Sequence, residues 1–155
     1  MPYFLQTSKL DRMTLIADAA IADPIAVEEI KRQWEKAWND HDADAVAAMC
    51  AEGLVYDEPA LGDTVYGRES IRSFVKGMAA GFPDYTFELQ GLYADVARRA
   101  VLVAWRFNGT HAKSGRTVEF HGDDRLEFGE DGLITAYRCL YDNALVLRQL
   151  GKTAL

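Results

Sequence analysis

Residues 86–141 read TFELQGLYADVARRAVLVAWRFNGTHAKSGRTVEFHGDDRLEFGEDGLITAYRCLY, and this stretch decides the fold. Alternating apolar and polar side chains in it are typical of strands that bury one face. Turn-forming residues divide it into four predicted strands, over 86–94, 100–110, 117–128 and 133–141. Because the separators have hairpin length, we expect these strands to form one antiparallel meander.

Three helices are predicted upstream of the meander. The first follows the helix-start pair Asp23–Pro24 and ends near His41, with apolar residues at three-to-four spacing. The second begins at Asp42, a good capping residue, and Gly53 ends it. The third occupies about 68–81, between a loop and a Gly-Phe-Pro turn. Helices followed by antiparallel strands indicate the α+β class.

Long strands twist and curl, so we expect a curved antiparallel sheet wrapped around the helices to form a cone-shaped pocket. At 155 residues the chain fits one domain. We assign that domain to residues 23–155 and interpret residues 1–22 as an N-terminal arm, since the core-forming periodicity lies after it.

Composition narrows the class of partner. The net charge of −7, without a Lys/Arg cluster, argues against nucleic acid and anionic membranes, which attract basic surfaces. Cys50 and Cys139 lie far apart and lack metal-ligand spacing, so we expect free thiols and no metal site. The mildly apolar segment 13–22 makes a poor signal sequence. We therefore expect a cytoplasmic protein that binds a small apolar molecule.

Strand alternation predicts which side chains face the interior of the cone. One face carries Trp105 and Phe107, then Gly122, Asp124, Leu126 and Phe128, then Tyr137, Cys139 and Tyr141. Asp124 is the charged member of this face, while Arg106 falls on the opposite one, so the pattern calls for no anionic substrate group. Aromatic residues on the helices and the first strand complete the expected pocket, which would be lined by Trp34, Trp38, Tyr56 and Phe74.

Several short motifs of the chain indicate a resemblance to a known protein family. They are Trp38-Asn-Asp-His-Asp42, Tyr56-Asp-Glu-Pro59, Gly67-Arg-Glu-Ser-Ile-Arg72, Phe82-Pro-Asp84, Gly132-Leu-Ile134, Tyr141-Asp142 and Leu147-Arg-Gln-Leu-Gly151. Together they resemble the nuclear-transport-factor-like superfamily, specifically its branch of SnoaL-like polyketide cyclases and ketosteroid isomerases. The resemblance implies the cystatin-like α+β barrel and a homodimer formed through the convex face of the sheet, and cyclic dimers are common in general.

The same resemblance assigns candidate roles. Glu58 falls where ketosteroid isomerases keep their general base, and Asp124 falls where they keep a protonated acid that donates to the substrate oxygen; that acid is a known example of a carboxylic acid kept neutral by an apolar site. Their oxyanion tyrosine matches Trp34, whose indole donates a hydrogen bond but is no acid. The acids of related epoxide hydrolases match Trp105, Phe107 and Cys139, so epoxide hydrolysis is set aside.

These residues predict a cofactor-free isomerase, cyclase or lyase that acts on a small apolar carbonyl compound. Glu58 and Asp124 are the expected catalytic residues, and no metal or cofactor is expected. Two alternatives stay open: a binding module for an apolar metabolite and a dimerisation module of the same fold. A structural interpretation also stays open, in which Glu58 faces solvent and Asp124 pairs with Arg106 or Arg125.

Overall fold

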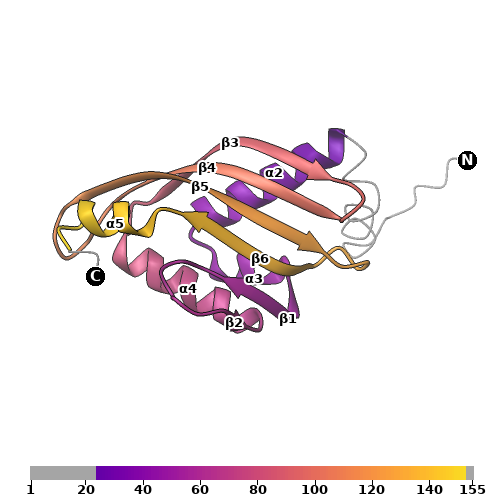
Figure 1. Cartoon of the computed structure of the whole chain (residues 1–155), viewed down its shortest axis with the longest axis horizontal. Coiled ribbons are helices and arrows are strands. Elements are labelled where there is room, and N and C mark those ends of the chain that lie inside the picture. The colour runs from indigo at the N-terminus through magenta and orange to yellow at the C-terminus, as the bar shows by residue number, and fades with distance from the viewer. Residues whose placement is uncertain (1–23, 153–155) are drawn as a thin grey trace, which may run out of the picture.

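The computed structural model describes residues 24–152 of the chain, so the predicted arm over 1–22 and the helix-start residue Asp23 lie outside the described residues. The elements, in chain order, are α2 (Pro24–Asn39), α3 (Ala43–Ala48), β1 (Cys50–Asp57), β2 (Val65–Tyr66), α4 (Arg68–Gly81), β3 (Thr86–Asp95), β4 (Ala100–Thr110), β5 (Thr117–Phe128), β6 (Ile134–Tyr141) and α5 (Asn143–Gln149) (Figure 1). The α+β class is confirmed.

The sheet is a curved, mixed sheet of six strands in the order β2-β1-β6-β5-β4-β3. Strands β3 to β6 form the predicted antiparallel meander, with bounds within one residue of the prediction. β1 pairs with β6 in parallel, which the sequence pattern did not predict, and β2 pairs antiparallel with β1. Because β2 and β3 are the two outer strands and do not pair with each other, the sheet stays open rather than closing into a barrel.

The second helix is shorter than predicted. Asp42 caps α3 as expected, since its carboxylate accepts a hydrogen bond from the Ala45 N–H at 2.9 Å. The helix ends at Ala48, however, and β1 begins at Cys50, where helix was predicted to continue toward Gly53. Strand pairing with β6 explains the difference, because tertiary pairing overrides weak local helix preference in so short a segment.

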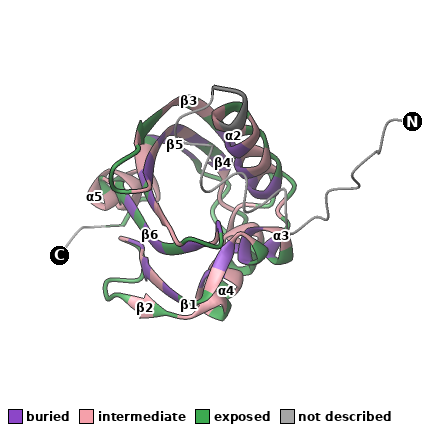
Figure 2. Ribbon diagram, turned by 90° about the vertical axis from the view of Figure 1, so that its right-hand side faces the viewer, coloured by how far each residue is buried: buried purple, intermediate pink, exposed green. Residues whose placement is uncertain are grey.

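The helices close the open side of the curled sheet. Figure 2 shows the sheet curling from β3 to β1 and β2, with α2, α3 and α4 on the side that it leaves open. The apolar face of α2 is buried against the sheet through Ile30, Trp34 and Trp38, and α4 buries Ile71 and Val75. The core therefore lies inside the cone, between the helices and the inward face of the strands.

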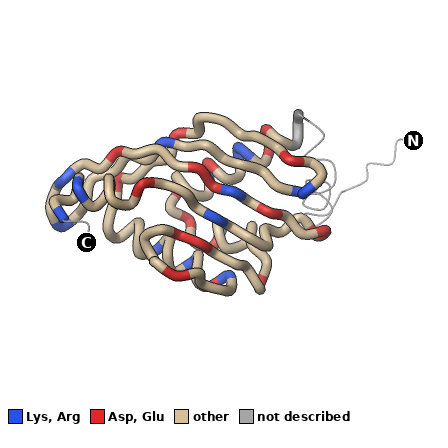
Figure 3. The backbone as a smooth tube through the Cα atoms, in the orientation of Figure 1, with Lys and Arg blue, Asp and Glu red and all other residues tan. Residues whose placement is uncertain are grey.

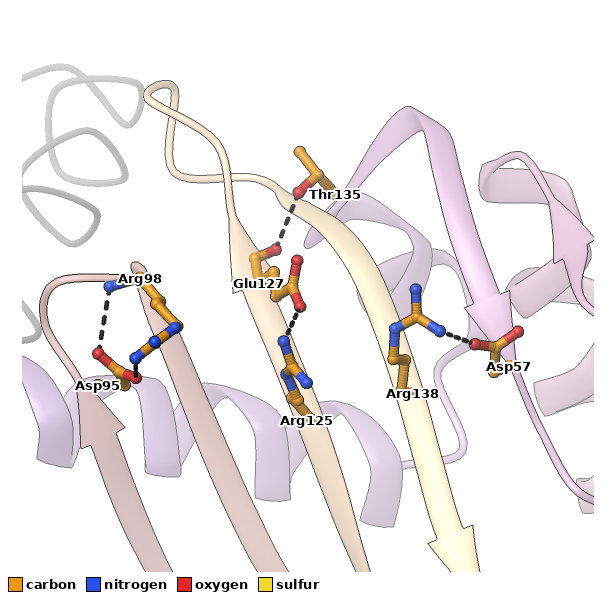
Figure 4. Close-up of polar contacts among 7 residues, drawn as sticks. All are labelled: Asp57, Asp95, Arg98, Arg125, Glu127, Thr135 and Arg138. Carbon is orange, nitrogen blue, oxygen red and sulfur yellow. Dashed lines mark hydrogen bonds and ion pairs between the residues drawn. The ribbon is translucent and has the colours of Figure 1, made fainter.

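The outer face of the sheet carries paired charges. Arg106 contacts Glu119 at 2.5 Å, Arg125 contacts Glu127 at 2.5 Å, and Arg138 pairs with Asp57. Figure 3 shows charged residues spread along these strands, and Figure 4 shows the Arg125 and Arg138 pairs together with the Arg98–Asp95 pair and the Thr135–Glu127 hydrogen bond. The arginines considered as partners of Asp124 thus bind other carboxylates on the opposite face.

A short helix at the carboxyl end was not predicted. α5 follows Asp142, whose carboxylate caps it by accepting from the Leu145 N–H at 3.0 Å. Its side chains are apolar on one face, yet none is fully buried. The Gln149 side-chain amide attaches the helix to β5 by bonding both backbone groups of Glu119, at 2.8 and 2.9 Å. In residues 24–152 no helix is long and apolar enough to cross a membrane.

Candidate active site

The two predicted catalytic carboxyls meet in a small chamber inside the cone. Glu58 is 6% exposed and Asp124 is 3% exposed, and both line a cavity of about 40 Å³. We call this cavity the inner chamber; the rest of its lining is aromatic or apolar apart from tyrosine hydroxyls, indole N–H groups and one thiol. Both carboxyl groups are thus held away from solvent in apolar surroundings.

Strand register explains why residues 66 positions apart meet. Asp124 on β5 lies directly opposite Cys139 on β6 in the antiparallel ladder. The parallel ladder between β1 and β6 pairs Asp57 with Arg138, and Glu58 follows at the end of β1. Glu58 and Asp124 therefore flank Cys139 from the two neighbouring strands.

Glu58 is fixed by two hydrogen bonds to the same oxygen. Its Oε1 accepts from the Tyr141 hydroxyl and from the Ala60 N–H, the latter at 3.0 Å. Burial raises the pKa of the Glu58 carboxyl, and the Tyr141 and Ala60 hydrogen bonds oppose that rise by stabilising the charged form. A carboxylate with a raised pKa and one oxygen outside these two bonds has the properties of a general base.

Asp124 is held by a chain of hydrogen bonds that starts on α2. The Trp34 Nε1–H donates to the Tyr137 hydroxyl at 2.9 Å, and that hydroxyl donates to Asp124 Oδ2. Burial raises the pKa of Asp124 to about 7, although the Tyr137 hydrogen bond acts in the opposite direction. The other oxygen, Oδ1, is buried and has no hydrogen-bond partner among the described residues.

Cys139 sits between the two carboxyls as a neutral thiol. Burial is the main cause that raises its pKa well above the ordinary value, and the charges of Asp124 and Glu58 add to the rise. A thiol whose pKa is raised by burial and by neighbouring carboxylates is a poor nucleophile. Cys139 is therefore a small buried side chain of the chamber wall rather than a nucleophile.

Most of the predicted pocket residues line the inner chamber, and two do not. Besides the carboxyls, the chamber is lined by Trp38, Tyr56, Phe74, Trp105, Phe107, Tyr137, Cys139 and Tyr141. Trp34 and Leu126, predicted to touch substrate, lie outside this lining and border a separate cavity of about 30 Å³. For Trp34 the reason is direct: its indole N–H is bonded to the Tyr137 hydroxyl, so Tyr137 stands between it and the chamber.

Three residues of the chamber lining were not predicted from the sequence: Met78, Phe87 and Phe120. Phe120 could have been found by extending the alternation of Gly122 and Asp124 back by two residues along β5. Met78 follows Phe74 by one helical turn on α4. Phe87 lies opposite Phe107 in the β3–β4 ladder, a pairing that depends on register and is not readable from β3 alone.

A larger apolar cavity adjoins the inner chamber. It has a volume of about 650 Å³ and lies between α4, α5 and the loop after Glu58. The two cavities share the side chains Phe74, Met78, Phe107, Phe120 and Tyr141. We call it the outer cavity. Its lining contains no charged side chain; its polar members are Ser70, Ser73, Asn143 and the Tyr141 hydroxyl. Among residues 24–152 no group of three or more His, Cys, Asp or Glu is arranged to hold a metal ion.

Comparison with known proteins gives one family and many structures. Residues 30–137 match the model of the SnoaL-like domain. No match to a curated protein sequence was found. A Catenulispora acidiphila protein with a ketosteroid isomerase-like fold, solved with trimethylamine, is similar at 22% identity and a TM-score of 0.70, over 80% of this chain and 93% of that one.

Two further structures have comparable similarity. The epoxide hydrolase/cyclase-like enzyme SalBIII of salinomycin pyran-ring formation has 22% identity and a TM-score of 0.68, over 77% of this chain and 93% of its own. A candidate polyketide cyclase from Bacillus cereus has 22% identity and a TM-score of 0.66, over 79% and 78%. At these identities the structures establish the fold, which is the ketosteroid isomerase-like fold expected from the motifs.

Proposed function

Since the chain belongs to the family of SnoaL-like domains, we propose that it is a cofactor-free acid–base isomerase, cyclase or lyase that acts on a small, neutral, apolar carbonyl compound. One observation carries this proposal: two buried carboxyls, from strands that are not adjacent in the sheet, line the same inner chamber. Burying a carboxyl is costly, so a pair of them in an apolar cavity indicates a chemical role.

In the proposed reaction Glu58 is the base. Its carboxylate takes a proton from the carbon next to the substrate carbonyl, and the C–H electron pair moves into the new carbon–carbon double bond as the carbonyl oxygen gains negative charge. Tyr141 and Ala60 hold Oε1, which leaves Oε2 for the proton. In an isomerisation Glu58 then returns this proton to a different carbon.

Asp124 is the proposed acid, and its hydrogen bonds place its proton. An indole N–H can only donate, so the Tyr137 oxygen accepts from Trp34 and its own hydrogen goes to Asp124 Oδ2. Oδ2 is therefore an acceptor, and the acidic proton belongs on Oδ1, the oxygen without a partner. From there it is donated to the carbonyl oxygen, or to a leaving group in an elimination.

The outer cavity supports the expected substrate class. The inner chamber, at about 40 Å³, has room for the reacting end of a molecule, whereas the outer cavity, at about 650 Å³, has room for its body. Since the outer lining is apolar and without charge, the body should be neutral and apolar.

The proposal is tested by proton exchange. A panel of neutral cyclic ketones is incubated with the protein in D₂O, and loss of the signal from hydrogens next to the carbonyl is followed by NMR. We expect exchange with the wild type, a loss of about 10²-fold or more in Glu58→Gln, and a decline as the pH rises through about 7, where Asp124 loses its proton. Asp124→Asn should also be slowed.

Asp123→Asn is the matched control. Asp123 is the sequence neighbour of Asp124, but it lies opposite the exposed Leu140 in the β5–β6 ladder, on the face of the sheet that points away from the chamber. It should exchange at the wild-type rate. Unchanged exchange in both Glu58→Gln and Asp124→Asn, for a ketone that the wild type does turn over, would show that the chemistry lies elsewhere.

A specific observation also favours a second candidate, a binding module for apolar metabolites. The lining of the outer cavity includes neither Glu58 nor Asp124, so a ligand can occupy this cavity without touching a carboxyl. If the protein binds neutral apolar compounds, if binding is unchanged in Glu58→Gln and Asp124→Asn, and if no ketone exchanges, the binding module replaces the enzyme.

A further inference from the structure

Three buried polar atoms of residues that line the inner chamber have no hydrogen-bond partner among the described residues: Trp38 Nε1, Trp105 Nε1 and Asp124 Oδ1. All three residues are buried, with exposed fractions of 3% or less. Buried hydrogen-bonding groups are satisfied in most folded proteins, and each exception calls for an explanation. Here the three exceptions border the same small cavity, which is where a bound molecule would supply missing partners.

Strand register brings two of these atoms, Trp105 Nε1 and Asp124 Oδ1, to the same part of the chamber. In the β4–β5 ladder Trp105 lies opposite Gly122, and Asp124 lies two residues further along the same face of β5. Side chains in this diagonal relation are within reach when one of them is a large aromatic. The Trp105 N–H is also near enough to Asp124 to lower the pKa of that carboxyl, which agrees with the two groups being neighbours in the chamber.

Gly122 is what allows the indole to take this position. A Cβ added at residue 122 would lie 2.3 Å from Trp105 Cη2 and 2.5 Å from Cζ2, so the ring occupies the space of the missing side chain. Phe87 and Phe120 pack edge-on against the ring, at centroid distances of 5.0 Å and 5.7 Å. The indole is therefore fixed between two strands and cannot turn its N–H toward another partner without disturbing the core.

Both atoms of this Trp105–Asp124 pair act as donors. An indole N–H has no acceptor capacity, and the Trp34–Tyr137–Asp124 chain places the proton of neutral Asp124 on Oδ1. Two converging donors are satisfied by one acceptor oxygen that offers two lone pairs. A carbonyl oxygen fits this requirement, and an enolate oxygen fits it better because it carries charge.

We propose that the Trp105 Nε1–H and the Asp124 Oδ1–H form a two-donor oxyanion site for the substrate carbonyl, with Trp105 as a further catalytic residue and Gly122 as its positioning residue. The catalytic part rests on the proposed function, whereas recognition of an oxygen acceptor by the two donors does not. Asp124 is able to transfer its proton; Trp105 stabilises charge without transferring one.

The test uses 2-naphthol, whose neutral and anionic forms differ in absorbance, and naphthalene as the matched ligand without oxygen. Both are measured in the Glu58→Gln protein, because a neutral amide represents the base after it has taken the substrate proton. The readout is the ratio of the two dissociation constants, together with the fraction of bound naphthol present as naphtholate. We expect a clear preference for 2-naphthol and a naphtholate fraction above that in buffer at the same pH.

Two added substitutions separate the N–H from the ring. Trp105→Phe keeps an aromatic ring but removes the donor, and it should reduce the preference for 2-naphthol by about tenfold or more, the range for a hydrogen bond to a charged group. Gly122→Ala keeps the indole but displaces it, while its Cβ also meets the Leu140 carbonyl of β6 at 2.9 Å, and it should reduce the preference as well. Gly53→Ala, at a strand position where an added Cβ meets no atom within 4 Å, should change nothing. Circular dichroism checks that each variant is folded.

The outcomes distinguish this proposal from the proposed function. If no ketone exchanges its protons but Trp105→Phe and Gly122→Ala both lose the preference, the enzyme proposal fails and the donor pair stands as a binding site. If ketones are turned over while Trp105→Phe changes neither turnover nor the preference, the donor pair is overturned. Absence of 2-naphthol binding, or equal binding of 2-naphthol and naphthalene, overturns it as well.

Discussion

Asp124 shows how a single residue acquires its chemistry from its surroundings. The same side chain in water would be ionised at neutral pH. In the inner chamber burial dominates over the opposing effects of Tyr137, Cys139 and Trp105, and its pKa rises to about 7. Glu58 has two donors on one oxygen, which oppose the same effect. The pKa of each carboxyl is thus set by the balance between its burial and its hydrogen bonds.

The raised pKa of Asp124 predicts how the stability of the protein depends on pH. The pKa of Asp124 is higher in the folded chain than in the unfolded chain, so unfolding releases a proton between these two values. Neutral Asp124 adds about 4 kcal/mol to the free energy of unfolding below about pH 4. This stabilisation decreases as the pH rises from about 4 to about 7, and it is lost above about pH 7. Urea unfolding of the wild type and Asp124→Asn from pH 4.5 to 8 measures it.

The variant has no titrating group at this position, so its free energy of unfolding should decline less with pH than that of the wild type. Glu58 contributes a decline of the same sign in both proteins, which is why the difference between them is the quantity to compare. Parallel curves for the two proteins would mean that Asp124 is ionised in the fold at neutral pH, and the acid role would be lost with it.

At the scale of elements, α5 forms one wall of the outer cavity. Val146, Leu147 and Leu150 face the cavity, and the Gln149 amide holds the helix against β5. A seven-residue helix without a fully buried side chain has little stability of its own. Its position therefore depends on its cap at Asp142, on this amide contact and on the packing of its partly buried apolar side chains against the core.

Filling the outer cavity from α5 should select among ligands by size. Val146→Trp adds a large ring to the cavity wall, and we expect at least tenfold weaker binding of a bulky neutral dye such as N-phenyl-1-naphthylamine, measured by fluorescence titration. Arg148→Trp adds the same ring on the exposed side of the helix and should bind the dye as the wild type does. Equal dye affinity in Val146→Trp and the wild type would place the binding site elsewhere.

At the scale of the whole molecule, the two faces of the sheet differ in polarity. The inner face is apolar and lines the cavities, and the outer face carries ion pairs. Leu140 interrupts this polar face: it lies on β6 between Cys139 and Tyr141, points outward and is 61% exposed. It borders a shallow depression that also includes Ala104 and His121. Exposed apolar side chains beside such a depression are typical of contact surfaces.

We therefore expect the homodimer that the family resemblance implies to form through this outer face. Leu140→Lys should shift the protein to monomer, because it places a like charge opposite its own copy across a two-fold axis. Light scattering after size-exclusion chromatography at two concentrations measures the mass. Tyr66→Ser, on the distant strand β2, is the control for loss of an exposed aromatic and should keep the wild-type mass. A monomeric wild type at both concentrations contradicts the prediction.

Much of this protein follows from local sequence pattern. The four long strands, the third helix and the Asp42 cap were predictable because strand alternation, helical spacing and capping are properties of neighbouring residues. The same alternation places Asp124 with Tyr137, Cys139 and Tyr141 on the inward face, and the motifs identify the family. The predicted arm over 1–22 lies outside the described residues and stays a prediction.

Other features were decided by contacts between distant segments. The early start of β1 and its parallel pairing with β6 have no local signal, and they bring Glu58 to Cys139. Trp34 reads as one more aromatic of a pocket, yet it bonds Tyr137 and acts behind the chamber wall. Alternation says which face a side chain takes, but register and packing decide which atoms meet, and these are fixed when the whole sheet curls around its helices.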